Sequence, residues 1–324
     1  MTFPVNAYVL AIASAAASTG LSLPLWRAWC RRTGLVDDPG HRKIHRQPVP
    51  LAGGLAVFTG LMVPLLVALL ALRAHWLDAA TVHTLEYGLG RRGAQLTAVL
   101  AGALGMLLVG WLDDRLELGA AAKFAGQAAV AGMVAASGVR ITLFVHSLVF
   151  SYAVTVLWIL TVTNAFNFLD NMNGLCGGVA AIAALMFALK AAAAGQYLVA
   201  LLALLVLGAL AGFLPYNYPN ASVFLGDAGS HLVGYLLGVL AILPHFYSAA
   251  NPSALAVLNP LLILAVPLGD LVWVVILRWR LGKPVYVGDT NHLSHRLVRR
   301  GWSPRGAVAL LWLLAALAGG LSML

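Results

Sequence analysis

The residues best suited to chemistry in this chain are acids in otherwise apolar surroundings. Asp113 and Asp114 are adjacent in GWLDDRLELG, and Asp227 lies between glycines in FLGDAGS. Carboxylate oxygens are preferred ligands of Mg²⁺, and small neighbours leave room for a phosphate beside the acid. These acids are therefore candidates for a metal-dependent phosphate site. The alternative is structural: a solvated helix end paired with Arg115 for the first two, and a helix N-cap for Asp227.

A periodic run of polar residues follows the apolar stretch that ends near residue 163. Asn164, Asn167, Asp170 and Asn173 recur every three residues in TNAFNFLDNMNGL. On a helix, neighbouring members of such a series share a groove while the end members diverge. Amides both donate and accept hydrogen bonds, so they suit a ribose, a base or an acetamido group, and they can complete an oxygen shell around a metal. An N-cap role would explain one of these residues and not the series.

The first polar connection, DDPGHRKIHRQPVPLAGG, is rich in both turn-forming and cationic residues. Its Pro and Gly residues indicate rigid turns, and Lys43 and His45 lie in its cationic centre with two arginines. Several donors on a stiff loop favour binding of an anion such as a diphosphate. Retention at an anionic membrane surface would explain the same charges.

The last polar stretch, DTNHLSHRL, combines an acid with three possible phosphate ligands. On a helix, Asp289, His292, His295 and Arg296 would largely share one side. Asp289 could fix the tautomer of a histidine, and the set could orient a phosphate. A Zn²⁺ site is the alternative, although no third strong ligand is nearby in sequence. Asp270, about two turns inside the preceding apolar segment, is a functional candidate because a carboxylate within a membrane helix is costly.

The elements that must position these residues are apolar helices. With 61% hydrophobic and 10% charged residues and a mean hydropathy of +0.89, the chain of 324 residues has the composition of an integral membrane protein, not of a water-soluble domain. About 20 apolar residues span the hydrocarbon core as a helix. We predict an all-α polytopic membrane protein with one domain over residues 1–324 and about ten membrane helices. They lie near residues 5–26, 51–72, 94–112, 120–137, 147–163, 175–194, 196–214, 229–247, 254–277 and 305–323.

The order of these segments predicts where the polar stretches meet. Every one falls in an odd-numbered connection, so all would face the same compartment. Basic residues concentrate in the same connections, and those outside them are Arg73, Arg91, Arg92, Arg140 and Lys190. By the positive-inside rule, this side is cytoplasmic and both termini are on the opposite side. The first segment is predicted to be a retained helix, and neither cysteine is assigned any chemistry.

The motifs together resemble those of a known family. DDPGHRKIHRQPVPLAGG, GWLDD, NAFNFLDNMNGL, FLGDAGS, PLGD and DTNHLSHRL occur in the order seen in polyprenyl-phosphate N-acetylhexosamine-1-phosphate transferases, which form glycosyltransferase family 4. The match covers roughly residues 34 to 300. The chain looks most similar to the bacterial undecaprenyl-phosphate N-acetylglucosamine-1-phosphate transferases. This resemblance implies a ten-helix enzyme of the bacterial inner membrane, with its active site on the cytoplasmic face.

The resemblance also implies a reaction and its partners. The phosphate of undecaprenyl phosphate attacks a UDP-N-acetylhexosamine, forming a lipid-linked sugar diphosphate and UMP as the first membrane step of a cell-envelope polysaccharide such as lipopolysaccharide. The implied metal is Mg²⁺, with Mn²⁺ as an alternative. The expected partners are the UDP-sugar, the polyprenyl phosphate and membrane lipid, with no nucleic acid; a homodimer is left open. The other functions considered are a phospho-N-acetylmuramoyl-pentapeptide transferase, a lipid or solute transporter and an inactive scaffold.

Roles follow from motif position. Asn167 and Asp227 would hold the metal, Asp113 would act as base or position the phosphate, and Asp114 would support it. Asp170 and Asn173 would face the nucleotide, with Phe224 stacking on uracil. The predicted catalytic residues are thus Asp113, Asp114, Asp170, Asp227 and His292, and the predicted substrate-binding residues are Lys43, His45, Asn164, Asn173, Phe224, His295 and Arg296.

The chain also departs from the family pattern at several positions. Asn173 replaces a common acid, Asn171 stands where Gly is usual, Ser294 replaces a histidine and Leu51 stands where Arg is frequent. We interpret these as marks of a divergent subgroup. A phosphate monoester has a second pKa near about 6, so it is mostly dianionic at neutral pH and needs little help from a base. Positioning and charge neutralisation should therefore dominate, and Asp227→Asn should harm turnover more than a change at Asp113.

Overall fold

The protein folds almost entirely into helices. A computed structural model describes residues 3–39, 47–74, 76, 78–244, 254–286 and 289–323, and 77% of it is helical. Its long apolar helices identify a polytopic membrane protein, as predicted. Within the described part, the exceptions to helix include a short antiparallel hairpin of β1 (Val36–Asp37) and β2 (Val49–Pro50). Lys43 and His45 lie outside the described residues, so their predicted role stays a prediction.

Seven helices in the described part of the chain are long and apolar enough to cross a membrane. The remaining helices are shorter or bent: α4 (Ala120–Ala136), α8 (Gly226–Leu240), α9 (Asn259–Ile263) with α10 (Ala265–Arg280), and α11 (Leu293–Arg299), while η1 (Ala254–Leu258) is a 3-10 turn. The candidate spans are α1 (Val5–Thr33), α2 (Gly53–Arg73), α3 (Ala79–Leu116), α5 (Leu148–Leu169), α6 (Leu175–Ala193), α7 (Tyr197–Asn217) and α12 (Pro304–Leu321).

Each of the ten predicted segments corresponds to at least one helix, but several boundaries differ. The third helix begins at Ala79, well before residue 94, and is 38 residues long. The ninth segment is not one straight helix, because it bends by 72° between residues 263 and 265. Pro267 accounts for the break: it has no N–H to donate to Ile263, and its ring would collide with that carbonyl in a continuous helix.

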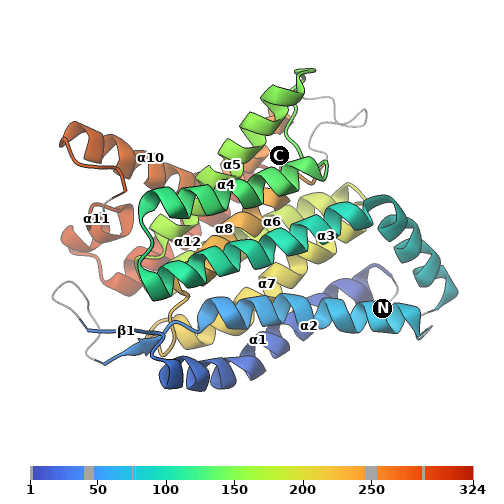
Figure 1. Ribbon diagram of the computed structural model, residues 1–324, viewed down its shortest axis with the longest axis horizontal. Coiled ribbons are helices and arrows are strands. Elements are labelled where there is room, and N and C mark those ends of the chain that lie inside the picture. The colour runs from blue at the N-terminus through green and yellow to red at the C-terminus, as the bar shows by residue number, and fades with distance from the viewer. Residues whose placement is uncertain are drawn as a thin grey trace.

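Helix α8 lies at the centre of the bundle, with α3 and α5 packed along it (Figure 1). Every residue from Ala228 to Leu240 is buried. A helix of 15 residues is too short to span the hydrocarbon unaided, and here its neighbours replace lipid on all sides. Consequently the first turn of α8, which carries Asp227, is held inside protein and close to the ends of several other helices.

Glycines allow other helices to approach this turn closely. A Cβ atom on Gly110 of α3 would lie 2.2 Å from the carbonyl oxygen of Asp227, and one on Gly54 of α2 would lie 2.4 Å from the backbone nitrogen of Gly229. Any side chain at either position would force the helices apart. The small residues therefore place the end of α3, with its two acids, directly against the start of α8.

The first polar connection is attached to the same end of α8. Phe224 donates its backbone N–H to the Pro50 carbonyl at 3.0 Å, and Gly53 donates to the Phe224 carbonyl at 2.9 Å. Next to it, Gly54 donates its backbone N–H to the Leu225 carbonyl at 3.0 Å. These backbone bonds hold β2 and the start of α2 beside FLGDAGS, so two of the predicted polar stretches meet in space.

Candidate active site

Asp114 fixes the start of α8. Its two carboxylate oxygens accept the backbone N–H groups of Asp227 and Ala228, at 2.8 and 3.0 Å. These N–H groups belong to the first turn of α8 and have no partner within the helix, so the carboxylate from α3 acts as a cap from outside. Asp114 thereby determines where the Asp227 side chain points, which agrees with a supporting role.

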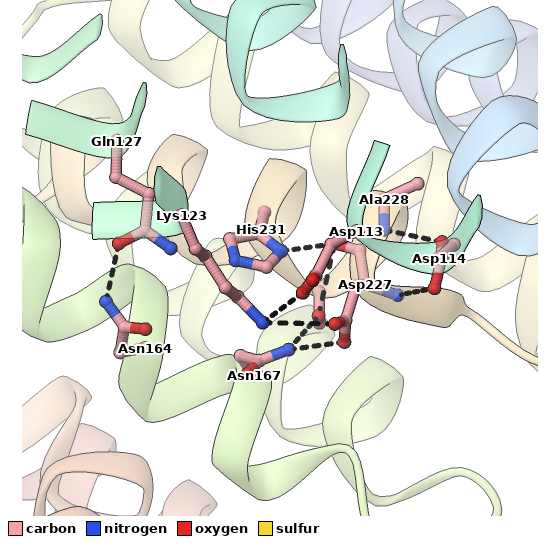
Figure 2. Close-up of polar contacts among 10 residues, drawn as sticks. Asp113, Asp114, Lys123, Gln127, Asn164, Asn167, Asp227, Ala228 and His231 are labelled. Atoms are coloured by element: carbon pink, nitrogen blue, oxygen red, sulfur yellow. Dashed lines mark hydrogen bonds and ion pairs between the residues drawn. The ribbon is translucent and has the colours of Figure 1, made fainter. Parts of the chain in front are cut away.

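Asp227 lies where α3, α4, α5 and α8 meet (Figure 2). One of its oxygens accepts Asn167 Nδ2 at 2.7 Å, and the other lies 3.0 Å from Lys123 Nζ. Lys123 also forms an ion pair with Asp113. Asn167 in addition donates to Ser230 Oγ at 3.0 Å, one turn further along α8. One lysine thus bridges two carboxylates that are far apart in sequence.

Asp170 places a further carboxyl group next to these residues. It follows the last residue of α5 and is partly exposed. Burial, followed by the negative charges of Asp227 and Asp114, raises the pKa of the Asp170 carboxyl to about 8. We refer to Asp113, Asp114, Lys123, Asn167, Asp170 and Asp227 as the acid cluster.

The acid cluster has the donor chemistry of a site for a hard cation, but not a preformed metal geometry. Lys123 pairs with two of the four carboxyl groups there, those of Asp113 and Asp227. Hard cations such as Mg²⁺ take oxygen ligands. Within the described residues, no group of three or more His, Cys, Asp or Glu side chains is arranged to hold a metal ion. Lys123 and Asn167 take the Asp227 oxygens in this conformation. The Mg²⁺ prediction therefore fits the donor set and stays a prediction.

The polar series on α5 does not continue as one helical stripe. The helix ends at Leu169, and residues 170–174 form a turn that leads into α6. Gly174 adopts a φ of +77°, and the chain changes direction there. Asn164 is buried and donates to Gln127 Oε1 at 2.7 Å, a contact between α5 and α4. Asn173 donates to the Pro219 carbonyl at 3.3 Å. Of the four residues, Asn167 is the one bonded to Asp227.

The last polar stretch forms a second cluster on α10 and α11. His292 Nδ1 lies 2.7 Å from Asp270 Oδ2, and the Leu293 N–H donates to Asp270 Oδ1 at 2.7 Å. The carboxylate that holds His292 is therefore Asp270 and not Asp289. Helix α11 begins only at Leu293, so Asp289 and His292 precede it and the predicted common helical side does not form.

Asp289 is bonded to Arg278 instead. Arg278 is 1% exposed; its Nε lies 3.1 Å from Asp289 Oδ2, and it also donates to the Val285 carbonyl at 2.5 Å. Although desolvation opposes ionisation, the hydrogen bonds from Arg278 and Asn291 lower the pKa of Asp289 to about 2. This pair of a buried arginine and a partly exposed acid links α10 to the connection that leads to α11.

The two remaining candidates on α11 are both partly buried. The Arg296 guanidinium lies over the Trp273 ring, 4.3 Å from its centroid. Burial, followed by the neighbouring His292 and Arg299, lowers the pKa of His295. Arg296 is thus the permanently charged member of the predicted phosphate ligands in this part of the chain. We refer to Asp270, Arg278, Asp289, His292, His295 and Arg296 as the C-terminal cluster.

Phe168 joins the two clusters. It lies on the last turn of α5, next to Asn167; the Arg278 guanidinium lies 5.0 Å from its centroid and the His292 ring meets it edge-on at 6.0 Å. Ser294 Oγ donates to Asn171 Oδ1 at 2.5 Å and adds a second link between α11 and the end of α5. The described polar stretches therefore converge on one end of the bundle.

Sequence reasoning missed several members of this site. The sequence patterns assign no individual role in the site to Lys123, Gln127, Phe168, Ser230 or Arg278. The available signal for Lys123 was a cation inside an apolar helix, which requires a buried anion as partner. The partner could not be read from the sequence, since Asp227 is 104 residues away.

Comparison with known proteins gives the family. Residues 96–245 match the sequence pattern described as glycosyl transferase family 4. A probable undecaprenyl-phosphate N-acetylglucosaminyl 1-phosphate transferase of Bacillus subtilis (strain 168) is 31% identical over 299 residues, covering 90% of this chain and 77% of the relative. The chain belongs to glycosyltransferase family 4.

Other members of glycosyltransferase family 4 resemble the chain over similar lengths. A decaprenyl-phosphate N-acetylglucosaminephosphotransferase of Mycolicibacterium smegmatis is 33% identical over 314 residues, covering 87% of this chain and 73% of the relative. An undecaprenyl-phosphate alpha-N-acetylglucosaminyl 1-phosphate transferase of Escherichia coli (strain K12) is 29% identical over 325 residues, covering 94% and 80%. The family membership makes this chain a membrane-bound transferase, and the names of these relatives specify transfer to a polyprenyl phosphate.

Proposed function

We propose that the protein transfers N-acetylhexosamine 1-phosphate from a UDP-sugar to undecaprenyl phosphate and releases UMP, with UDP-N-acetylglucosamine as the donor. The observation that carries this proposal is the Asp227 carboxylate, which lies between Lys123 and Asn167 and beside Asp113. Phosphoryl transfer depends mainly on positioning and on neutralising charge, and this arrangement combines a cation with oxygen ligands at one point. The names of the relatives support the lipid phosphate and the sugar.

The acid cluster would act on the reacting phosphates. Lys123 would contact the incoming phosphate of the lipid, and Asp113, its ion-pair partner, would position that lysine. Asp227 and Asn167 are the residues that would hold Mg²⁺, which when bound neutralises charge on the sugar-linked diphosphate. Because the phosphate monoester is already largely dianionic at neutral pH, Asp113 is assigned positioning in preference to proton removal.

The C-terminal cluster would bind the diphosphate of the UDP-sugar. Arg296 offers a permanent positive charge, and its guanidinium plane is already held over Trp273. The His292 ring packs against Phe168, which lies on the last turn of α5. The candidates for binding the nucleotide are Asp170, which follows α5, and Phe224, which precedes α8.

The location of the substrates sets the orientation of the protein. Nucleotide sugars are made in the cytosol and the lipid phosphate lies at the membrane surface, so the proposed reaction requires the shared end of the bundle to face the cytoplasm of a bacterial inner membrane. The basic residues at this end agree with that orientation. Cysteine labelling of single-cysteine variants on both termini would test it, with labelling from the outside expected.

The activity is tested with purified protein in lipid, a panel of UDP-sugars and undecaprenyl phosphate. UMP release that requires UDP-N-acetylglucosamine, the lipid phosphate and Mg²⁺ together is expected. UMP release with UDP-N-acetylmuramoyl-pentapeptide instead would identify the activity as that of a phospho-N-acetylmuramoyl-pentapeptide transferase. Absence of release with every UDP-sugar, from protein that is monodisperse and unfolds cooperatively, would overturn the proposed function.

A further inference from the structure

Asp270 is a buried acid whose role the proposed reaction does not explain. It lies on α10 and is 1% exposed. A carboxylate in this position is costly unless its oxygens are paired. Both are: Oδ2 is 2.7 Å from His292 Nδ1, and Oδ1 accepts the Leu293 N–H at 2.7 Å. The two bonds connect one acid to an imidazole and to the first residue of α11.

The position of α11 depends on this acid and on one further α10 residue. Leu293 is the first residue of α11, and its N–H has no partner within that helix, so Asp270 caps the helix from a different segment. One turn further along α10, Trp273 lies under the Arg296 guanidinium. The two contacts, on neighbouring turns of both helices, fix where the donors of α11 lie.

The Asp270 bond also decides which imidazole nitrogen of His292 is available. An ionised carboxylate accepts hydrogen bonds, so Nδ1 carries the hydrogen and is turned toward α10. Nε2 is the atom that remains for a ligand, and it donates a hydrogen bond to a phosphate oxygen when the ring is the imidazolium, with hydrogen on both nitrogens. The Phe168 ring meets the imidazole edge-on at 6.0 Å and precedes Asp170 by two residues. The orientation of His292 is therefore tied to the end of α5 that carries the acid cluster.

We propose that Asp270 is a positioning residue: it fixes the His292 ring so that Nε2 faces the diphosphate of the sugar nucleotide, and it holds the start of α11. The inference rests on the proposed function for the identity of the ligand. It gives a buried membrane carboxylate a task in substrate binding that is exerted through His292. The same carboxylate stabilises α11, so the test must separate the two effects.

A double-mutant cycle separates them. Asp270→Asn keeps the shape of the side chain and an oxygen that can accept the Leu293 N–H, while it removes the carboxylate from His292. In the wild-type background we expect kcat/KM for the UDP-sugar to fall roughly 10- to 100-fold, the usual cost of losing a partner that orients a ligand-binding histidine. In a His292→Ala background, Asp270→Asn should lower kcat/KM for the UDP-sugar little further, because the residue through which it acts is already absent. An undiminished further loss would overturn the inference.

The matched control is Trp273→Leu, which removes the other contact between α10 and α11. It acts on Arg296 and not on the His292 imidazole, so most of its cost in kcat/KM should remain in the His292→Ala background. If Trp273→Leu also loses its effect in that background, general loosening of α11 explains both results and the positioning role is wrong.

A measurement without turnover keeps this inference separate from the proposed function. In protein labelled with ¹⁵N-histidine, the His292 signals are assigned by their absence in His292→Ala. Nδ1 of His292 should be protonated in the wild type, and the signals should shift in Asp270→Asn. A wild-type ring with hydrogen on Nε2 alone would overturn the inference. Failure of every UDP-sugar in the activity assay would overturn the proposed function and leave this result standing.

Discussion

The acid cluster and the C-terminal cluster use the same kinds of side chain with different charge balance. In the first, Lys123 pairs with Asp113 and Asp227, and Asp114 and Asp170 add two further carboxyl groups. In the second, Asp289 is bonded to Arg278 and Asp270 to His292. Arg296 stacks on Trp273, and no ion pair of Arg296 is found within the described residues. An excess of acid is stable in a low-dielectric site only if a cation neutralises it, whereas a paired set with a surplus cation is ready to bind an anion. This difference supports the proposal that one cluster serves metal-dependent transfer and the other binds the diphosphate.

The sharpest way to break this division is to compare two acids within the first cluster. Asp227→Asn removes the proposed metal ligand and should lower kcat on the order of 10³-fold or more, as expected when the main charge neutralisation in phosphoryl transfer is lost. Asp113→Asn removes a positioning acid, and roughly 100-fold is expected. UMP release by each variant provides the measurement. Equal losses, or a larger loss for Asp113→Asn, would contradict the assignment of the metal to Asp227.

Lys123 tests whether the ammonium group serves the substrate or only the fold. Lys123→Gln should lower kcat/KM for undecaprenyl phosphate about 100-fold, because a preorganised charge at the reacting phosphate is lost. Lys190→Gln is the control, since that lysine lies near the end of α6 and has no contact with the acid cluster. Cooperative thermal unfolding of both variants shows whether the fold persists. Unchanged kinetics in a folded Lys123→Gln protein would reduce Lys123 to a structural counter-ion.

Arg296 sharpens the other half of the comparison. Arg296→Ala should raise the KM for the UDP-sugar about 10-fold, the equivalent of roughly 1.4 kcal/mol, and change kcat less. Arg299→Ala, an exposed arginine on the same helix, is the matched control and should have little effect. A fall in kcat with an unaltered KM would show that this cluster acts in the transfer step and not in binding.

The smallest effect on turnover is expected at Asn164. Its amide is bonded to Gln127 in a buried contact between α4 and α5. Asn164→Ala leaves that glutamine without its donor and should lower the free energy of unfolding by about 1–3 kcal/mol. The KM for the UDP-sugar should stay unchanged. A raised KM at undiminished thermal stability would instead support the substrate-binding role predicted from the sequence.

The sequence predicted where the helices lie and which acids are candidates for the site, and the reason is physical. Long apolar runs must be helical in lipid, and acids beside them are costly enough to indicate function. The pairing of side chains could not be predicted in this way. Lys123 with Asp227, Asp270 with His292 and Arg278 with Asp289 depend on how α4, α8, α10 and α11 pack. The prediction about Asp289 was wrong because sequence proximity favoured the nearer acid over one from the preceding helix.

Local backbone breaks were a second limit. The stripe from Asn164 to Asn173 has helical spacing, yet the helix stops at Leu169 and Gly174 redirects the chain. The bend before α10 likewise has a proline signal in the sequence, but its angle of 72° is set by packing. The first of these breaks lies next to Asp170 and separates Asn173 from Asn167.

The most direct test of the division between the clusters is the dependence of UMP release on free Mg²⁺. It is measured for the wild type, for Asp227→Glu, which retains a carboxylate, and for Arg296→Ala. The account predicts that Asp227→Glu needs more Mg²⁺ for half-maximal rate, while Arg296→Ala keeps the wild-type requirement and needs more UDP-sugar. A shifted Mg²⁺ requirement in Arg296→Ala with none in Asp227→Glu, or a wild-type rate that does not depend on Mg²⁺, would contradict it.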